Sequence, residues 1–288
     1  MGAINERQFD TGTVSINYAE VGAGGPLLLL HGGSSRWQSL ERLARQLAPR
    51  WRVYAPDLRG HGHSGRTPGR YRLADYADDI VTLLERVTGT AYIFGHSLGG
   101  EVALTVAARR PDLVRALAVG DTPLSASSLR QRSEPSRPML ALWRDLAASG
   151  DLADDIADAL REMVVPDFEG RTGRAEDLMG HGSPWFAFMA SCLRDLDPTM
   201  LDAVIEFDEM HSGYEAGRLL PRIACPVLLI QGDPSRGGAL PDDDVALART
   251  LLTDVREALI DGAGHALYIA TIGDVLVNFF RSIDVERQ

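Results

Sequence analysis

Short, uninterrupted apolar runs recur along most of the chain and are separated by segments with helical periodicity. The runs predict strands over residues 26–30, 91–94, 116–119 and 227–230, and strands are also predicted over 52–55 and 255–260, whose sequences RVYA and VREALI contain charged residues. Such runs are typical of strands that are buried on both faces of a parallel sheet. Apolar residues spaced three and four apart predict helices over about 37–48, 74–87, 101–108, 243–252 and 271–283. This alternation predicts an α/β fold, with a mostly parallel central sheet flanked by helices.

Residues 13–20 show a different pattern, in which apolar and polar positions alternate. Val14, Ile16 and Tyr18 fall on one side of a strand with this periodicity. Turn-forming residues stand before this strand at 10–12 and after it at 22–25. We therefore expect a hairpin at the edge of the sheet.

The strand pattern stops between residues 123 and 217. This segment has no run typical of a buried strand, and its apolar residues predict helices instead, for example over 139–148 and 152–163. Its many large apolar side chains argue against a disordered linker. We interpret residues 123–217 as a helical cap, or lid, inserted before the last two strands of a core domain formed by 1–122 and 218–288.

Composition narrows the functions that are open to the chain. It has 288 residues and a formal net charge of −11, which argues against nucleic-acid binding because that needs a basic face. Hydrophobic residues make up 45%, enough for a sizeable core, but no apolar run is long enough to predict a transmembrane helix, so no membrane partner is expected. The N-terminus lacks an apolar signal-peptide core and there are two cysteines, Cys192 and Cys225, so a cytoplasmic protein is expected.

No cofactor is expected from the motifs. The histidines lack ligand-like spacing with carboxylates or thiols, so no metal site is predicted. Phosphate-loop and dinucleotide-binding fingerprints are absent, and the glycine-rich stretch at 22–25 precedes its strand, which is the wrong order for a nucleotide loop. The expected partner is a small-molecule substrate. Oligomerisation is possible, but the sequence does not indicate it.

The segment 95–100, GHSLGG, lies between a predicted strand and a predicted helix. A Gly-x-Ser-x-Gly pattern in that setting is typical of a nucleophile elbow, a sharp turn that exposes a serine at the start of a helix. Side chains at Gly95 and Gly99 would collide with the neighbouring chain in such a turn. The alternative is an ordinary strand-to-helix turn built from small residues.

Other polar residues follow predicted strands in the same way. They are His31, Asp121, Asp233 and His265, together with Ser97. Because ligands of a parallel α/β sheet bind beyond the carboxyl ends of its strands, we expect these side chains to converge at one edge. The 123–217 segment leaves the sheet from that edge, so it can cover the site.

With these motifs the chain resembles the α/β-hydrolase fold family. The resemblance rests on HGG at 31–33, DLRGHGHS at 57–64, GHSLGG at 95–100 and GAGH at 262–265, and it covers nearly the whole chain apart from the insertion. It implies a hydrolase with a serine nucleophile, with the insertion as a cap over the active site, and the family's order of serine, acid and histidine.

The resemblance implies roles for four residues. Ser97 is the nucleophile and His265 the general base, because a neutral hydroxyl needs a base to take its proton. The backbone N–H groups of Gly33 and Leu98 would form the oxyanion hole.

The acid of the triad is left open between two residues. The family usually places it three residues after the glycine that ends the strand before the last, but Ser235 occupies that position here. Asp121, at the end of the strand before the insertion, is our first choice, since some family members place their acid there. Asp233 is the alternative. The acid would hold His265 in the right tautomer and stabilise its charged form.

The substrate is expected to be a small-to-medium apolar carboxylic ester or lactone. Serine forms an acyl-enzyme with such a compound, and water then releases it. Aromatic and apolar residues of the cap and of the segment after the oxyanion loop are candidates for the pocket, although many of them can equally be cap core. They are Trp37, Trp143, Trp185, Phe186 and Met189.

Two other functions remain open. A carbon–carbon bond hydrolase of the ring-cleavage type uses the same triad and is expected to have a cap arginine for the substrate carboxylate, such as Arg194 or Arg218. A ligand-binding receptor of the same fold is the non-catalytic alternative.

Overall fold

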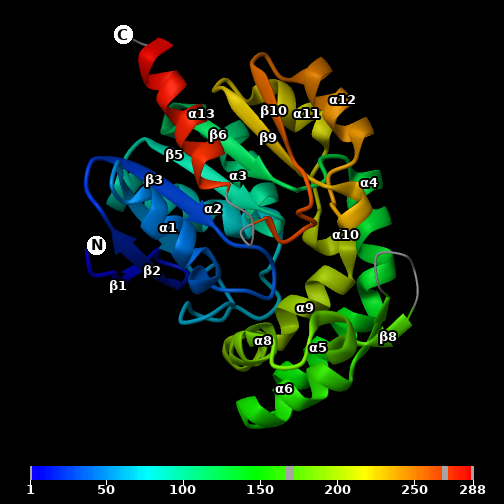
Figure 1. Ribbon diagram of the computed structural model, residues 1–288. Coiled ribbons are helices and arrows are strands. Elements are labelled where there is room, and N and C mark those ends of the chain that lie inside the picture. Colours follow the sequence, from blue (N-terminus) through cyan, green and yellow to red (C-terminus); the bar gives the residue numbers. More distant parts are fainter. Residues whose placement is uncertain (1, 167–171, 268–271, 287–288) are drawn as a thin grey trace.

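The structure, a computed structural model, describes residues 2–166, 172–267 and 272–286 (Figure 1). The strands are β1 (Asn5–Asp10), β2 (Ser15–Val21), β3 (Gly25–Leu30), β4 (Trp51–Pro56), β5 (Ala91–His96), β6 (Val114–Gly120), β7 (Val164–Pro166), β8 (Thr172–Arg174), β9 (Val227–Gly232) and β10 (Val255–Ile260). The helices are α1 (Glu41–Leu47), α2 (Leu73–Leu83), α3 (Leu98–Arg109), α4 (Ala126–Ser133), α5 (Arg137–Ser149), α6 (Ala153–Glu162), α7 (Ala175–Met179), α8 (Pro184–Asp195), α9 (Pro198–Ile205), α10 (Phe207–Met210), α11 (Ala216–Leu219), α12 (Asp242–Leu251) and α13 (Gly273–Glu286).

The described strands form one eight-stranded sheet in the order β1-β2-β4-β3-β5-β6-β9-β10. Strands β4, β3, β5, β6, β9 and β10 run parallel, whereas β1 and β2 pair antiparallel with each other and β2 pairs antiparallel with β4. Helices lie on both sides of this sheet (Figure 1). The predicted α/β fold with a mostly parallel sheet is therefore confirmed.

Strand β3 illustrates why its sequence is uninterruptedly apolar. Leu27 and Leu29 are fully buried in the core cluster that includes residues of α1 and α13, and Leu28 and Leu30 are fully buried in the cluster that includes residues of α2 and α3. Successive side chains of a strand point to opposite faces, so a strand covered by helices on both sides needs apolar residues at every position.

The hairpin expected at the edge of the sheet is present, and it extends further toward the N-terminus than the pattern predicts. Ser15–Val21 forms β2, and Asn5–Asp10 forms the edge strand β1, paired with it from Asn5 with Glu20 to Asp10 with Ser15. Most side chains of β1 are exposed. An exposed edge strand is held by backbone hydrogen bonds, which leave no apolar pattern in the sequence.

The segment between β6 and β9 is mainly helical, as expected, and α5 and α6 match the helices predicted at 139–148 and 152–163. In Figure 1 the helices α5, α6, α8 and α9 gather beside the sheet-bearing part of the molecule. The segment also contains the short antiparallel pair of β7 and β8, which the helical interpretation lacked. The described side chains of β8 are not buried, so this pair carries no buried-strand signal.

One continuous apolar cluster connects the insertion with the rest of the chain. It includes Ile156 of α6 and Phe186 of α8 together with Val102 of α3. The insertion therefore packs against the sheet-bearing part through buried apolar contacts. The boundaries of the cap at residues 123 and 217 stay a prediction.

Two helix ends differ from the prediction. The helix expected over 37–48 begins as a 3-10 turn at Trp37–Leu40 before α1, and the helix expected over 74–87 ends in a π turn at Leu84–Thr88 after α2. The last helix begins at Gly273, and Thr271, where it was expected to begin, lies outside the described residues. Within the described ranges, no helix has both the length and the apolar character needed to cross a bilayer.

Candidate active site

The turn between β5 and α3 has the strained geometry of a nucleophile elbow. Ser97 has a φ of 52° and a ψ of −122°, a conformation that costs a side-chain-bearing residue free energy, and it stands directly before the first turn of α3. A Cβ atom on Gly95 would lie 2.2 Å from the backbone oxygen of Gly99, and one on Gly99 would lie 2.4 Å from that of Leu30. Both glycines are therefore required by the close approach of backbone to backbone.

Replacing Gly99 with alanine is expected to destabilise the protein by at least about 2 kcal/mol, because the new methyl group meets backbone atoms that cannot rotate away. Thermal unfolding measures this as a lower midpoint. Gly217→Ala is the matched control, since Gly217 lies in α11 with nothing within 4 Å of its added Cβ, and we expect it to be neutral or slightly stabilising. Equal midpoints for the two variants would contradict the packing argument.

Ser97, His265 and Asp121 form a hydrogen-bonded chain across the carboxyl end of the sheet. His265 Nε2 lies 3.1 Å from Ser97 Oγ, and His265 Nδ1 lies 2.8 Å from Asp121 Oδ2. A neutral imidazole protonated on Nδ1 donates to the carboxylate and accepts from the hydroxyl. This arrangement can remove the proton of Ser97 while the carboxylate stabilises the positive charge that develops on the ring.

Asp121 is fully buried and is surrounded by donors. Besides His265, its carboxylate accepts the backbone N–H groups of Gly232 at 2.8 Å, Ala239 at 2.7 Å and Leu240 at 3.2 Å. Burial by itself would raise the pKa of Asp121, but His265 and the backbone donors outweigh burial and lower the pKa to about 2. The group is therefore ionised at neutral pH.

Asp233, the alternative acid, makes other contacts. Its carboxylate accepts from the backbone N–H and the hydroxyl of Ser235 at 2.9 and 2.7 Å and from the Gly262 N–H at 3.2 Å. His265 Nδ1 donates to Asp121 and not to Asp233. The long loop after β9 thus supplies backbone donors to Asp121.

The predicted oxyanion-hole residues lie next to each other. A Cβ atom on Gly33 would lie 3.8 Å from Cδ2 and 3.9 Å from Cβ of Leu98, and one on Gly32 would lie 3.4 Å from Ser97 Cβ. The loop after β3 therefore runs directly beside the elbow. Backbone N–H groups at this position can stabilise an oxyanion that forms at a carbon attacked by Ser97.

Two buried histidines hold this loop in place. His31 donates from Nδ1 to the Gly32 carbonyl and accepts the Leu58 N–H at Nε2, while His61 Nε2 accepts the Ser34 N–H. Burial lowers the pKa of His31 to about 4 and that of His61 to about 3. Both are therefore neutral and can act as acceptors.

His96 contributes a contact that sequence reasoning missed. Its Nε2 lies 2.6 Å from the backbone oxygen of His265, and the two rings are 4.8 Å apart. Burial and the neighbouring His265 lower the pKa of His96 to about 3, so the ring is neutral and donates from Nε2 to the carbonyl. His96 thereby fixes the backbone of the residue whose side chain faces Ser97. Nothing local to GHSLGG indicates this contact, because His265 is 169 residues away.

The predicted pocket residues lie in different environments. Trp37 is 5% exposed and belongs to the core cluster shared with α1 and α13, and its backbone N–H donates to Asp57. Phe186 and Met189 of α8 are buried in the cluster that connects the insertion with α3. Trp143 and Trp185 pack partly buried against that cluster, with ring centroids 6.3 Å apart. Most of these aromatic side chains therefore contribute to core packing.

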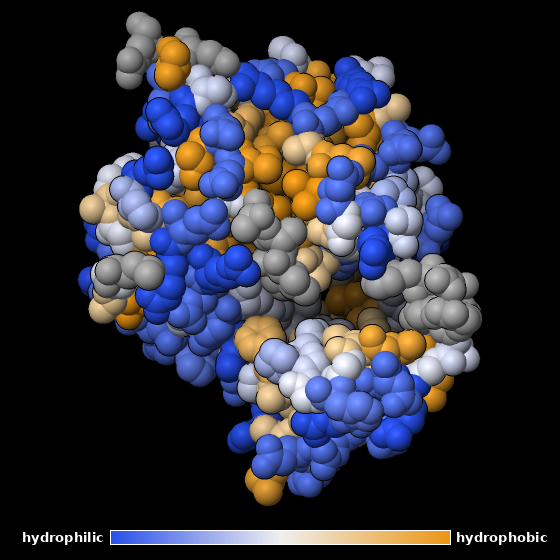
Figure 2. Space-filling model, in the orientation of Figure 1, coloured by the Kyte–Doolittle hydropathy of each residue, from blue (hydrophilic) through white to orange (hydrophobic). Residues whose placement is uncertain are grey.

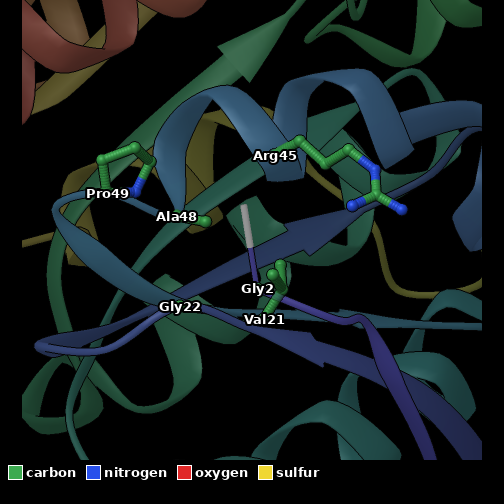
Figure 3. Close-up of a pocket in the computed structure, with 6 residues that line it drawn as sticks. All are labelled: Gly2, Val21, Gly22, Arg45, Ala48 and Pro49. Atoms are coloured by element: carbon green, nitrogen blue, oxygen red, sulfur yellow. The ribbon is translucent and has the colours of Figure 1, made fainter.

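A separate hollow (Figure 3) lies near the amino ends of the strands, away from the Ser97 site. It is bordered by the end of β2, the end of α1 and the segment that follows it, near the amino ends of β3 and β4, whereas Ser97 follows the carboxyl end of β5. The lining residues are Gly2, Val21, Gly22, Arg45, Ala48 and Pro49. They include no nucleophile or carboxylate, so this hollow does not compete with the Ser97 site.

Among residues 2–166, 172–267 and 272–286, no group of three or more histidine, cysteine, aspartate or glutamate side chains is placed to hold a metal ion.

Comparison with known proteins identifies the family. The sequence model described as alpha/beta hydrolase fold matches residues 25–270. The chain is 29% identical over 269 residues to 2-(acetamidomethylene)succinate hydrolase of Mesorhizobium japonicum, covering 90% of this chain and 88% of that protein. It is 30% identical over 247 residues to the lipase LipV of Mycobacterium tuberculosis, covering 84% and 79%.

A solved structure agrees with this assignment. The N-acyl homoserine lactonase AidH has a TM-score of 0.69 and 26% identity to this chain, with 98% of this chain and 96% of that one covered. The family match spans most of the sequence, and the sheet order and the elbow geometry described above fit it. The chain belongs to the alpha/beta hydrolase fold family and is an enzyme of that family, a hydrolase.

Proposed function

We propose that this enzyme is a serine hydrolase that cleaves a small-to-medium apolar carboxylic ester or lactone through an acyl-enzyme on Ser97. The observation that carries the proposal is the hydrogen-bonded chain from Ser97 Oγ through His265 to the buried Asp121 carboxylate. His265 acts as the general base, Asp121 orients it, and the N–H groups of Gly33 and Leu98 form the oxyanion hole.

The proposed reaction has two acyl-transfer steps. Ser97 Oγ attacks the carbonyl carbon while its proton moves to His265 Nε2, and the negative charge that develops on the carbonyl oxygen is held by the two backbone donors, each worth about 3–4 kcal/mol. The bond to the alcohol oxygen breaks, and His265 returns the proton to that oxygen. Water then attacks the acyl-enzyme with His265 again as base, which releases the acid and restores Ser97. With a lactone the product is a single hydroxy acid.

An apolar substrate is supported by the surface around the insertion. Figure 2 shows a hollow between the part of the molecule that carries β9, β10 and α12 and the part that carries α5, α6 and α8, with apolar colour inside it. The similarity to a lipase and to an acyl-homoserine lactonase supports an ester or lactone bond as the one cleaved. Apolar walls with few polar groups suit such a ligand.

The carbon–carbon bond alternative lacks a comparable observation. It needs a cap arginine directed at a substrate carboxylate, but Arg194 is exposed, and the Arg218 side chain is 82% exposed and paired with Glu215. We therefore retain the ester or lactone as the proposed substrate. The cytoplasm remains the expected location.

A fluorophosphonate probe is expected to label the enzyme on one residue, Ser97, because the probe reacts with a serine activated by a base. Mass spectrometry of the labelled peptide measures this, and the Ser97→Ala variant is the control. A panel of esters, lactones and vinylogous diketones should then give the highest kcat/KM for an ester or lactone with an apolar acyl group. Absence of labelling would overturn the serine mechanism, and preferential cleavage of a diketone would overturn the substrate class.

A further inference from the structure

A histidine–glutamate contact joins the end of the insertion to the helix that begins after Ser97. His211, directly after α10, places Nε2 2.8 Å from Oε2 of Glu101 on α3. Both side chains are nearly buried, with 9% and 11% exposed. Glu101 is one helical turn beyond the serine, and its backbone N–H donates to the Ser97 carbonyl at 3.1 Å. The pair therefore connects the cap segment with the first turn of the nucleophile helix.

The contacts of His211 determine its protonation state. Its Nδ1 lies 2.9 Å from the Phe207 backbone oxygen, and its Nε2 faces the Glu101 carboxylate. Both partners are acceptors, whereas a neutral imidazole has only one N–H to donate. Both hydrogen bonds can form at the same time only if the ring carries two protons and is an imidazolium. The Phe207 ring stacks on His211 at 4.0 Å, which favours a cation.

Charged and titratable groups around His211 come from several elements. Burial by itself lowers the pKa of His211, but Glu101 and the Phe207 carbonyl outweigh burial, so the pKa is raised above its ordinary value. Arg130 of α4, 4.4 Å above the Phe207 ring, acts in the opposite direction. The charged and titratable groups near His211 are Glu101, Arg130 and Tyr214. Arg130 is paired with Asp208, and Asp244 lies beyond Tyr214.

Two further contacts between the insertion and the rest of the chain use other side chains. Arg36, after the oxyanion loop, pairs with Asp195 of α8 at 2.7 Å. Tyr71 donates to Asp197 at 2.5 Å, and burial together with Asp197 raises the pKa of Tyr71 above its ordinary value. Among these contacts the His211 pair is the one that contains a histidine, the side chain whose ordinary pKa lies near neutral pH.

We propose that His211 is a positioning residue which, in its imidazolium form, holds the end of the cap against the nucleophile helix through Glu101, so that closure of the cap over Ser97 weakens when His211 loses its proton. The part of this proposal that concerns activity rests on the proposed function. The part that concerns protonation and stability does not, and it is tested separately.

The direction of the pH effect follows from the raised pKa of His211. The stabilising contribution of the pair is complete below pH 6.5, the ordinary pKa of histidine, and is lost as the pH rises through the higher pKa of the folded state. Loss of the proton leaves the ring with one N–H for two acceptors, the Glu101 carboxylate and the Phe207 carbonyl, and removes the positive charge that attracts Glu101. We therefore expect the cap to be held less firmly at alkaline pH.

NMR titration of the histidine Cε1–Hε1 signals of the intact enzyme tests the protonation state. We expect one signal, absent from His211→Gln, to titrate above pH 6.5. In Glu101→Gln the same signal should titrate below pH 6.5, because burial then dominates. A His211 signal that titrates at or below pH 6.5 in the wild-type enzyme, or that Glu101→Gln leaves unchanged, would overturn the proposal.

Unfolding midpoints and KM test the positioning role. At pH 6 the wild-type enzyme should have a higher unfolding midpoint than His211→Gln. The difference between the two midpoints should shrink by roughly 2–4 °C from pH 6 to pH 9. The ratio of KM in His211→Gln to KM in the wild type should be roughly five- to tenfold at pH 6 and approach one at pH 9, with kcat changing less. His181→Gln is the matched control, since His181 faces Glu176 at 3.3 Å but is 78% exposed, and it should show neither effect.

These outcomes separate the two proposals. A midpoint difference that does not change with pH would refute the ion-pair role even if Ser97 proves to be the nucleophile. The NMR titration and the midpoint difference could be as expected while the ratio of the two KM values does not change with pH. That outcome would show that His211 does not act on closure of the cap. If Ser97 proves not to be the nucleophile, the NMR and midpoint results still test the His211 pair, because neither measurement requires turnover.

Discussion

Replacing Ser97 by alanine is expected to lower kcat for a short p-nitrophenyl ester by about 10⁴–10⁶-fold, because the attacking oxygen is removed and only the binding and oxyanion contacts remain. The unfolding midpoint should stay close to that of the wild type, since Ser97 adopts its strained backbone conformation within a turn whose glycines are unchanged. Steady-state kinetics and thermal unfolding of the same preparation measure the two effects.

Ser235→Ala is the matched control for this experiment. Ser235 stands where the family usually has its acid, and its hydroxyl contacts Asp233 rather than His265. We expect this variant to retain kcat within about twofold of the wild type, as is usual for a group that does not touch the reacting atoms. If Ser97→Ala keeps a substantial fraction of the wild-type rate, the acyl-enzyme mechanism is wrong.

Asp121→Asn is expected to lower kcat by about 10³–10⁴-fold with a much smaller change in KM. All four hydrogen bonds described for the Asp121 carboxylate come from donors, namely His265 Nδ1 and three backbone N–H groups. The asparagine NH₂ group would face donors, so His265 either loses its partner or is held in the wrong tautomer. The same ester assay measures the loss.

Asp233→Asn distinguishes the two candidate acids. The Asp233 side chain is half-buried and its carboxylate accepts from Ser235 and Gly262, so this substitution should change kcat only a few-fold. The opposite result, with Asp233→Asn inactive and Asp121→Asn active, would transfer the role of the acid to Asp233.

The strands of the sheet can be predicted from the sequence where they are buried on both faces. Strand β3, with Leu27 and Leu29 facing one core and Leu28 and Leu30 the other, leaves an apolar run that polar surface segments cannot imitate. Strand β1 and the pair of β7 and β8 leave no such run, because exposed strands are held by backbone pairing and not by burial of their side chains.

The positions of Ser97 and His265 at strand ends are also local features, since each follows an apolar strand in a glycine-containing turn. The choice of acid is not local. Strands β6 and β9 are neighbours in the sheet, so Asp121 and Asp233 both stand at its carboxyl edge. Only the path of the loop after β9, which turns Ala239 N–H and Leu240 N–H toward Asp121, decides which carboxylate lies beside His265.

The sequence by itself therefore determined the α/β architecture, the elbow and the family, because periodicity and turn chemistry are properties of short segments. The tertiary structure alone decided which carboxylate meets His265, that His96 holds the His265 backbone, and that His211 meets Glu101. These contacts join residues more than one hundred positions apart, and their energies depend on burial and on the number of donors at each acceptor, which no local pattern records.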